Sequence, residues 1–313
     1  MKAYVLHENP EWYPPFAAAF EAEGVDHEPW LLGEGLLDLD APPPPGVYWS
    51  RMSASSHTRG HLLAKDHTRA VLSWLEAHGR RVVNGRRVLE LEMSKVDQLT
   101  ALRAAGIEVP RTLAVVGRED LLAAAAKLPA PFIAKHNQGG KGLGVALFDS
   151  VDAFAEHLDS PGYEPPVDGI TLLQEYLRAA RPHITRVEIV DGGVVYALTA
   201  DTARGGFELC PADACAVPAV PADSCMLDAA PGLFALREDF DHPVLGQYLD
   251  FARRHGIEVA GFEFIETEDG RLVTYDVNTN TNYNPGVEAA APRSGPRQIA
   301  RMVRRLIKEE ETR

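Results

Sequence analysis

Apolar residues over the first hundred positions switch repeatedly between strand-like and helix-like spacing. Short apolar or alternating runs predict strands at 2–7, 28–32 and 47–50. Helically spaced apolar residues predict helices at 16–23, 60–78 and 89–105, and a glycine follows each of them. Strands that alternate with helices in this way are typical of an α/β layer on a mainly parallel sheet.

The pattern changes after Pro110. Shorter strands are predicted at 112–116, 132–136, 145–148 and 172–177, and short helices at 120–127 and 151–157. Glycine turns at 191–193 and 269–270 predict two hairpins, and further helices are predicted at 242–255 and 295–310. We therefore expect an α/β fold that becomes α+β in its C-terminal half.

Length, composition and charge limit the classes of protein that fit. A chain of 313 residues is long enough for two or three subdomains with cores of their own. No apolar run approaches the ~20 residues of a membrane span. The first residues read as a strand rather than a signal peptide, so we expect a cytoplasmic protein. The net charge of −14 argues against nucleic acids and anionic membranes as partners.

Three cysteines, Cys210, Cys215 and Cys225, occur without the paired Cys-x-x-Cys spacing of a metal site. Free thiols are the expected state in a chain that lacks a secretion signal, and a structural zinc is disfavoured. A core position and a redox or substrate-contacting role both stay open for these residues.

The last predicted hairpin brings two acidic residues together. A turn of residues 269 and 270 alone fixes three facing pairs, which are Glu268 with Arg271, Phe264 with Tyr275, and Glu263 with Asp276. Asn278 lies two residues beyond Asp276 and therefore points to the same face of the sheet.

Two carboxylates that face each other on a largely buried sheet repel one another. A shared proton or a divalent cation would offset the repulsion, and an exposed acidic face is the simpler alternative. The oxygens of Glu263, Asp276 and Asn278 suit Mg²⁺ when phosphates and water complete its shell. We favour the metal because the polar run 278–286 converges on the same place, where Asn280 is a candidate substrate-binding residue.

Residues 138–144 form a glycine-rich loop between two predicted strands. A strand rather than a helix follows the loop, which excludes a Walker loop and a dinucleotide fingerprint. A flap whose backbone amides approach phosphates fits the sequence, and so does a hairpin tip without function. Lys135 is either an edge-strand lysine or a buried cation that binds an anion, whereas Lys95 looks like any surface lysine.

The segment 50–61 follows the predicted strand 47–50 and is rich in polar side chains. Ligands of open α/β sheets bind at the carboxyl ends of strands, so candidate substrate-binding residues are Arg51, Ser53, His57 and Arg59. The two arginines could clamp a substrate carboxylate. The alternative is that the serines and the threonine only cap the following helix.

Together these segments resemble the ATP-grasp superfamily, and most closely its glutamate-ligase branch of RimK-type enzymes, over about residues 80–290. Ser94-Lys95 and the residues up to Pro110 look like the first nucleotide lysine of the family and the strand entry after it. The run 131–135 with the glycine flap looks like the second lysine and the phosphate loop. The run 173–177 looks like the hinge strand that reads adenine, and Glu263, Asp276 and Asn278 fall on the Mg²⁺ ligands.

This resemblance implies ATP and Mg²⁺ as cofactors, with two metal ions and with Mn²⁺ as a substitute. The nucleotide-binding residues that it implies are Lys95, Lys135, Gly139, Gly140, Lys141, Gly142, Gln174, Glu175, Tyr176 and Leu177. Lys135 and Arg186 would take part in catalysis, Arg186 by holding the γ-phosphate or an acyl phosphate. The implied layout is a parallel-sheet domain at 1–94, a central lid at 95–175, and an antiparallel-sheet subdomain with the metal site at 176–313.

The reaction implied by the resemblance joins a carboxylate to an amine through an acyl phosphate. Its partners would be small-molecule or peptide acids and amines, and related enzymes are often dimers or tetramers. A phosphotransferase that acts on a hydroxyl and a nucleotide-binding module without turnover are the alternatives. Ile184 stands where RimK-type enzymes carry an Asp, and residues 205–210 replace a basic Arg-x-Asn segment, so the acid and the amine stay open.

Overall fold

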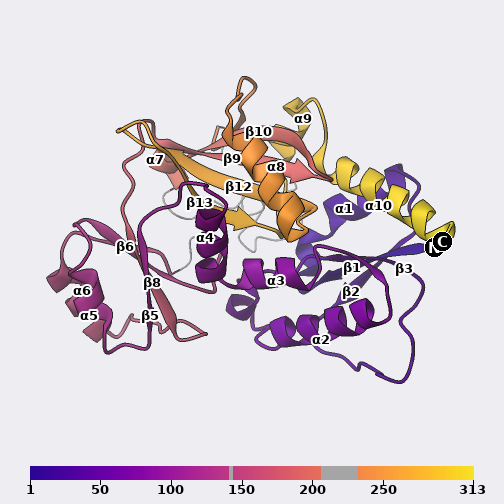
Figure 1. Ribbon diagram of the computed structural model, residues 1–313, viewed down its shortest axis with the longest axis horizontal. Helices are drawn as coiled ribbons and strands as arrows, with labels where there is room; N and C mark the ends of the chain where they lie inside the picture. Colours follow the sequence, from indigo (N-terminus) through magenta and orange to yellow (C-terminus); the bar gives the residue numbers. More distant parts are fainter. Residues whose placement is uncertain (141–143, 206–231) are drawn as a thin grey trace, which may run out of the picture.

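The protein is built on three β-sheets (Figure 1). The computed structural model describes residues 1–140, 144–205 and 232–313. The predictions for Lys141, Gly142 and the three cysteines fall outside these ranges. Among the described residues, no helix is long and apolar enough to cross a membrane.

The first sheet is parallel, in the order β2-β1-β3-β4. Its strands are β1 (Lys2–His7), β2 (His27–Leu31), β3 (Gly46–Ser50) and β4 (Arg81–Val83), of which β4 was not predicted. Its helices are α1 (Pro14–Ala22), α2 (Ala64–Ala77), α3 (Arg86–Met93) and the short 3₁₀ helices η1 (Pro10–Trp12) and η2 (Ser56–Arg59). Every residue of β3 is buried, as its valine, tyrosine and tryptophan predict for a strand inside a parallel sheet.

The prediction of one helix at 89–105 is wrong. Two helices, α3 and α4 (Lys95–Ala104), meet at Ser94, whose backbone is extended with φ −135° and ψ 110°. The Ser94 hydroxyl accepts a hydrogen bond from the Asp97 backbone amide and so caps α4. The break places Lys95 at the first position of α4.

The second sheet is antiparallel, in the order β5-β8-β6-β7. Its elements are β5 (Thr112–Val116), α5 (Leu121–Ala125), β6 (Phe132–His136), β7 (Ala146–Phe148), α6 (Val151–Asp159) and β8 (Ile170–Glu175). Phe154 of α6 packs against Phe132 and Phe148 in a small core of its own. This sheet and its two helices stand at the left of Figure 1, beside the rest of the protein.

The third sheet is antiparallel as well, in the order β11-β10-β9-β12-β13. Its strands are β9 (His183–Val190), β10 (Gly193–Asp201), β11 (Phe234–Leu236), β12 (Val259–Glu266) and β13 (Leu272–Asn278), and the helices of this part are α7 (Thr202–Gly205), α8 (Val244–His255) and α9 (Pro285–Ala290). Tyr248 of α8 stacks on Phe262 at 4.4 Å between ring centroids. A parallel layer followed by antiparallel sheets confirms the predicted fold class.

The pairing of β12 with β13 agrees with the prediction at the end where the acidic residues lie. Glu263 faces Asp276, as predicted. Phe264 faces Thr274, so the predicted pair of Phe264 with Tyr275 is wrong. The cause is a β-bulge beside Glu263 that places the extra residue Tyr275 in β13.

The predicted turn at the other end of this hairpin is wrong too. The Thr267 amide donates to the Arg271 carbonyl at 2.9 Å, which closes a turn of residues 268–270 and separates Glu268 from Arg271. This longer turn moves the register by one residue, and the bulge moves it back. The two departures from ideal geometry therefore cancel where the acidic residues face each other.

The last helix, α10 (Gly295–Glu311), packs on the first sheet. Its residues Ile299 and Val303 share a buried cluster with Val5 and Trp49. The two ends of the chain lie side by side in Figure 1, where the Met1 ammonium group pairs with Glu311. The first layer of the fold is thus completed by the last segment of the chain.

Candidate active site

A cavity of about 470 Å³ is lined by residues from all three parts of the fold. Its wall contains most of the predicted site residues, which are Ser53, Lys95, Lys135, Gly139, Gly140, Gln174, Glu175, Tyr176, Leu177, Arg186, Glu263, Asp276, Asn278 and Asn280. The structure therefore brings the predicted nucleotide, metal and catalytic residues together. Arg51, His57 and Arg59 are not part of this wall.

Glu263 and Asp276 face each other and take different cationic partners. Arg186 Nη1 donates to Glu263 Oε1 at 2.8 Å, and the Tyr275 hydroxyl donates to Oε2 at 2.9 Å. Lys95 Nζ donates to Asp276 Oδ1 at 2.5 Å. Burial raises the pKa of Glu263. Burial also acts on Asp276, but Lys95, together with Lys135 and Arg186, outweighs it and lowers the pKa of Asp276. Cations of the protein itself thus offset the repulsion that the sequence indicated.

The oxygen atoms beside this pair fit a divalent cation. The Oδ1 atoms of Asn278 and Asn280 are buried and have no hydrogen-bond partner among the described residues. Together with Glu263 and Asp276, Asn278 would supply hard oxygen ligands of the kind that Mg²⁺ prefers, and Asn280 adds a polar group to the same wall. The described ranges contain no group of three or more His, Cys, Asp or Glu side chains that could hold a metal, so phosphate oxygens and water would complete its shell.

Arg186 lies nearly buried on β9, with a side chain that is 3% exposed. Besides its bond to Glu263, its Nε donates to Glu188 at 2.6 Å and its Nη2 donates to the Thr281 hydroxyl. Gly261 lies next to it on β12, where a Cβ atom would come within 2.5 Å of Nε. The glycine therefore leaves the space in which the guanidinium lies across the sheet.

Lys135 is a buried cation on β6. Within the described ranges, no ion pair joins it to an acidic residue, although it is only 7% exposed. Burial and the nearby Lys95 lower the pKa of Lys135 to about 7. Because β6 lies between β8 and β7, the edge-strand alternative is wrong. A phosphate that enters the cavity would supply a negative charge to pair with the Lys135 ammonium group.

The predicted hinge residues follow one another along the cavity wall where β8 leaves the second sheet. Gln174 Nε2 donates to Thr112 Oγ1 at 2.8 Å, and the Glu175 amide donates to the Arg111 carbonyl at 2.9 Å. The apolar residues of the surrounding wall are Ile133, Val145, Leu147, Leu177, Ile184 and Ile265. An apolar slot beside the end of a strand suits a planar aromatic base.

The root of the glycine flap lies against the polar segment 50–61. A Cβ atom on Gly140 would lie 3.5 Å from the Cβ atom of Ser55. The hydroxyl groups of Ser53 and Ser55 are 2.9 Å apart, and both residues line the cavity. The predicted phosphate flap and part of the predicted substrate segment therefore border the same space.

Arg51 is buried and is not part of the cavity wall. Its Nη2 donates to the Thr281 carbonyl at 3.0 Å and to Asn282 Oδ1 at 2.8 Å, and its guanidinium lies 4.1 Å from the centre of the Phe16 ring. Burial lowers the pKa of Arg51 to about 9. His57 Nδ1 lies 3.1 Å from a backbone carbonyl. These contacts stabilise the segment that follows β3, and Arg51 does not form the predicted clamp for a substrate carboxylate.

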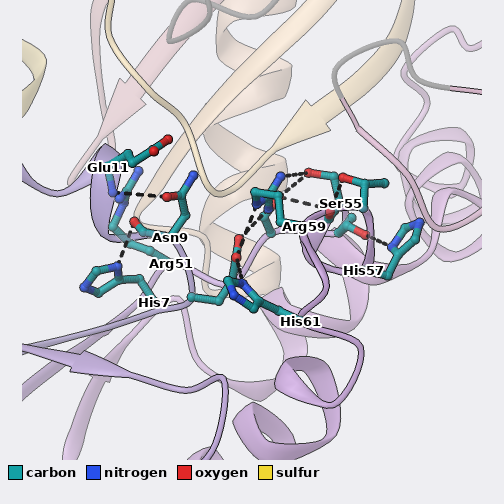
Figure 2. A network of polar contacts seen from close by, with 12 residues as sticks. His7, Asn9, Glu11, Arg51, Ser55, His57, Arg59 and His61 are labelled. Atoms are coloured by element: carbon teal, nitrogen blue, oxygen red, sulfur yellow. Dashed lines mark hydrogen bonds and ion pairs between the residues drawn. The ribbon is translucent and has the colours of Figure 1, made fainter. Parts of the chain in front are cut away.

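Arg59 is occupied by a carboxylate of the protein. Its Nε donates to Glu8 Oε2 at 3.3 Å, its Nη2 pairs with Oε1, and its Nη1 donates to Ser55 Oγ at 3.0 Å. The ring of Trp12 covers the guanidinium at 4.6 Å. His61 Nδ1 lies 2.7 Å from the same Glu8 carboxylate, and Figure 2 shows Arg59 between Ser55 and His61. The charges of this segment thus compensate one another.

The cavity-wall residues that sequence reasoning missed include Trp12, Glu92 and Tyr275. Tyr275 reaches the site because the bulge turns it beside Glu263. Trp12 comes from a short 3₁₀ helix far from the other site residues in sequence. Glu92 stands three residues before Lys95, which is helical spacing, but the break at Ser94 hides the relation.

Comparison with known proteins supports the assignment of the fold. Residues 93–210 match the family described as the RimK-like ATP-grasp domain. A search of curated protein sequences gave no match. Among solved structures, a RimK domain ATP-grasp protein from Sphaerobacter thermophilus has a TM-score of 0.68 and 18% identity, over 97% of this chain and 99% of that chain.

Several of the similar structures contain a nucleotide. The ATP-grasp ligase PsnB, complexed with a minimal precursor, Mg and ADP, has a TM-score of 0.64 and 18% identity over 97% of each chain. The D-alanine–D-alanine ligase from Bacillus anthracis, complexed with ATP, has a TM-score of 0.65 and 16% identity over 99% of each chain. At these identities the likeness establishes the fold, which is the ATP-grasp fold predicted from the sequence.

Proposed function

We propose that this ATP-grasp protein is an ATP- and Mg²⁺-dependent ligase that joins a carboxylate to an amine through an acyl phosphate. The observation that supports this most directly is the facing pair of Glu263 and Asp276 beside two lysines and Arg186 in one cavity. Opposed carboxylates next to buried, unpartnered amide oxygens fit a metal that carries phosphates. A cytoplasmic location, as expected from the sequence, fits the demand for ATP.

We propose one orientation for ATP in the cavity. The adenine ring would lie in the apolar slot beside Gln174–Leu177, which we propose as the hinge. The phosphates would lie near Lys95, Lys135 and the flap residues Gly139 and Gly140. Mg²⁺, as two ions replaceable by Mn²⁺, would be held by Glu263, Asp276 and Asn278 and would neutralise the phosphates there.

The proposed layout of the chain follows from this orientation. Residues 1–94 would supply the substrate side, 95–175 the lid over the nucleotide, and 176–313 the metal site. We propose that Ser53 and Asn280, which line the wall between these parts, hydrogen-bond a substrate. The precursor bound by PsnB makes a peptide one candidate source of the acid or the amine.

The chemistry needs positioning and charge neutralisation more than a dedicated protein nucleophile. A carboxylate oxygen of the substrate attacks the γ-phosphorus, and ADP leaves. The guanidinium of Arg186 would neutralise charge that develops on the transferred phosphoryl group, and Lys135 would do so from the second sheet. An amine then attacks the acyl carbon, and phosphate leaves with the electron pair of the broken C–O bond.

A hydroxylamine trap tests this proposal. The protein is incubated with Mg-ATP, hydroxylamine and a panel of acids that includes amino acids and short acidic peptides. A ligase is expected to form a hydroxamate with at least one acid and to release one phosphate for each hydroxamate. Phosphate transfer to a hydroxyl without any hydroxamate would instead identify a kinase, and binding of ATP without turnover would identify a nucleotide-binding module.

A further inference from the structure

Glu92 lies in the cavity wall on α3, where the N-terminal segment, the lysine of α4 and the end of β13 come together. Its Oε2 accepts hydrogen bonds from the Thr279 amide at 2.7 Å and from the Thr279 hydroxyl at 2.8 Å. Its Oε1 has one long contact, at 3.4 Å, with the Ala54 amide. One carboxylate oxygen is therefore well held, and the other is weakly bound.

Glu92 differs from the other carboxylates of the wall in its partners. Glu263 is paired with Arg186, Asp276 with Lys95, and Glu175 with Arg271 at 3.7 Å. In the described ranges, Glu92 has hydrogen bonds from neutral donors and no ion pair with a cation. A half-buried carboxylate without an ion-pair partner gains from an ammonium group or a proton that the substrate brings.

We propose that Glu92 is the catalytic base that binds the incoming amine substrate as an ammonium ion and accepts its proton at Oε1. This inference rests on the proposed ligase function. A carboxylate at this place would repel the acid substrate and the phosphates, so the amine is the substrate that it suits. Burial also raises the pKa of Glu92, against the opposing hydrogen bonds from Thr279 and the smaller effect of Lys95, and a raised pKa suits a base.

The proton balance of the step is complete. The bound ammonium gives one proton to Glu92 Oε1, and the neutral amine attacks the acyl carbon. The N–C bond forms, the bond between the acyl carbon and the phosphate oxygen breaks, and the second nitrogen proton leaves with phosphate. Glu92 then returns its proton to solvent. The charged groups that face Glu92 are Lys95 from α4 and Asp276 from β13, and Thr279 and Ala54 add only neutral donors.

Hydroxylamine and methylamine separate this role from a structural one. The two molecules have the same size, but near neutral pH hydroxylamine is largely uncharged, whereas methylamine is an ammonium ion. The acid identified with the hydroxylamine trap is offered with either amine to the wild type and to Glu92→Gln. We expect the variant to form the hydroxamate at nearly the wild-type rate and the methylamide about 100-fold more slowly or worse.

A rise in pH should restore part of the loss, because more methylamine is then neutral before it binds. The matched control is Glu90→Gln, since Glu90 lies on the same helix and pairs with Arg69 outside the cavity. This control should leave both rates unchanged, and thermal unfolding shows whether either variant is folded.

Three results would overturn the assignment of Glu92. They are an equal loss of both products in Glu92→Gln, an unchanged methylamide rate in that variant, and a wild type that uses hydroxylamine but not methylamine. Failure of the ligase proposal itself looks different, because the wild type would then form no hydroxamate with any acid.

Discussion

At the end of the cavity that the third sheet borders, the side chains of Lys95, Lys135 and Arg186 line the wall. At the end bordered by the segment 50–61, both Arg51 and Arg59 turn into the protein instead. The first end presents cations to a ligand, whereas the second end presents hydroxyl and amide groups together with the carboxylate of Glu92. We infer that phosphates are recognised by cations at one end. At the other end the substrates are selected by shape and hydrogen bonds and, for the amine, by the proposed contact with Glu92.

Substitution of Asp276 breaks the charged end and has the largest expected effect. In Asp276→Ala, a proposed metal ligand is lost and Lys95 loses its partner at 2.5 Å. We expect ATP turnover, measured as phosphate release, to fall by about 100- to 1,000-fold. The control is Asp269→Ala, because Asp269 lies in the exposed turn of the same hairpin. Near-normal turnover in Asp276→Ala would falsify the metal assignment.

The pH dependence of ATP binding tests Lys135 at the charged end of the cavity, and its expected effect is smaller than that of Asp276→Ala. The pKa of Lys135 in the free protein is lowered to about 7, so the side chain is protonated below pH 7 and neutral above it. Phosphates bind the protonated form, and ATP binding should therefore take up a proton above pH 7. The Kd for ATP should rise by up to about tenfold per pH unit above pH 7.

Calorimetry at several pH values, in buffers of different ionisation enthalpy, measures both the Kd and the proton uptake. In Lys135→Met the affinity should be weaker at pH 7, and the pH dependence should be gone. The exposed Lys127 provides the control variant Lys127→Met, which should keep the wild-type profile. An unchanged profile in Lys135→Met would mean that another group takes up the proton.

Substitution of Glu8 tests the end of the cavity bordered by the segment 50–61, where Glu8 pairs with Arg59. Of the three substitutions, it should affect nucleotide binding least. In Glu8→Gln the charge of Arg59 loses its partner, which we expect to lower the free energy of unfolding by about 1–3 kcal/mol. The Kd for ATP should stay within about twofold of the wild-type value, since the phosphate end is untouched. Chemical denaturation and calorimetry measure the two quantities, with the exposed Glu11→Gln as control. A large loss of ATP affinity would contradict the division into two ends.

The sequence was sufficient to predict that Glu263 faces Asp276 because pairing at one end of a hairpin depends on local spacing. The prediction of Glu263 opposite Asp276 was correct even though its premise, a turn of two residues, was wrong. The register near the turn depends on two local features, the Thr267 side chain in the turn and the β-bulge beside Glu263. The Thr267 hydroxyl accepts from the Arg271 amide at 3.0 Å and favours the longer turn, a contact that no periodicity in the sequence reveals.

The N-terminal end of the cavity was harder to predict because tertiary contacts determine it. Arg51 and Arg59 follow a strand in the manner of ligand-binding residues, but their partners are Thr281, Asn282 and Glu8. Two of these partners lie more than 200 positions away in the sequence. Polar residues at the end of a strand therefore predict a polar site, and only the fold decides whether a ligand or the protein satisfies them.

The position of α10 has a consequence for how the protein is made on the ribosome. Ile299, Val303 and Leu306 cover one face of the first sheet, so that face stays bare while most of the chain is being synthesised. The first sheet cannot complete its core until α10 has been synthesised. Contacts between segments so far apart in the sequence slow folding and leave apolar surface accessible to chaperones. Since Met1 lies against Glu311, a circular permutant in which α10 directly preceded β1 should shorten that delay.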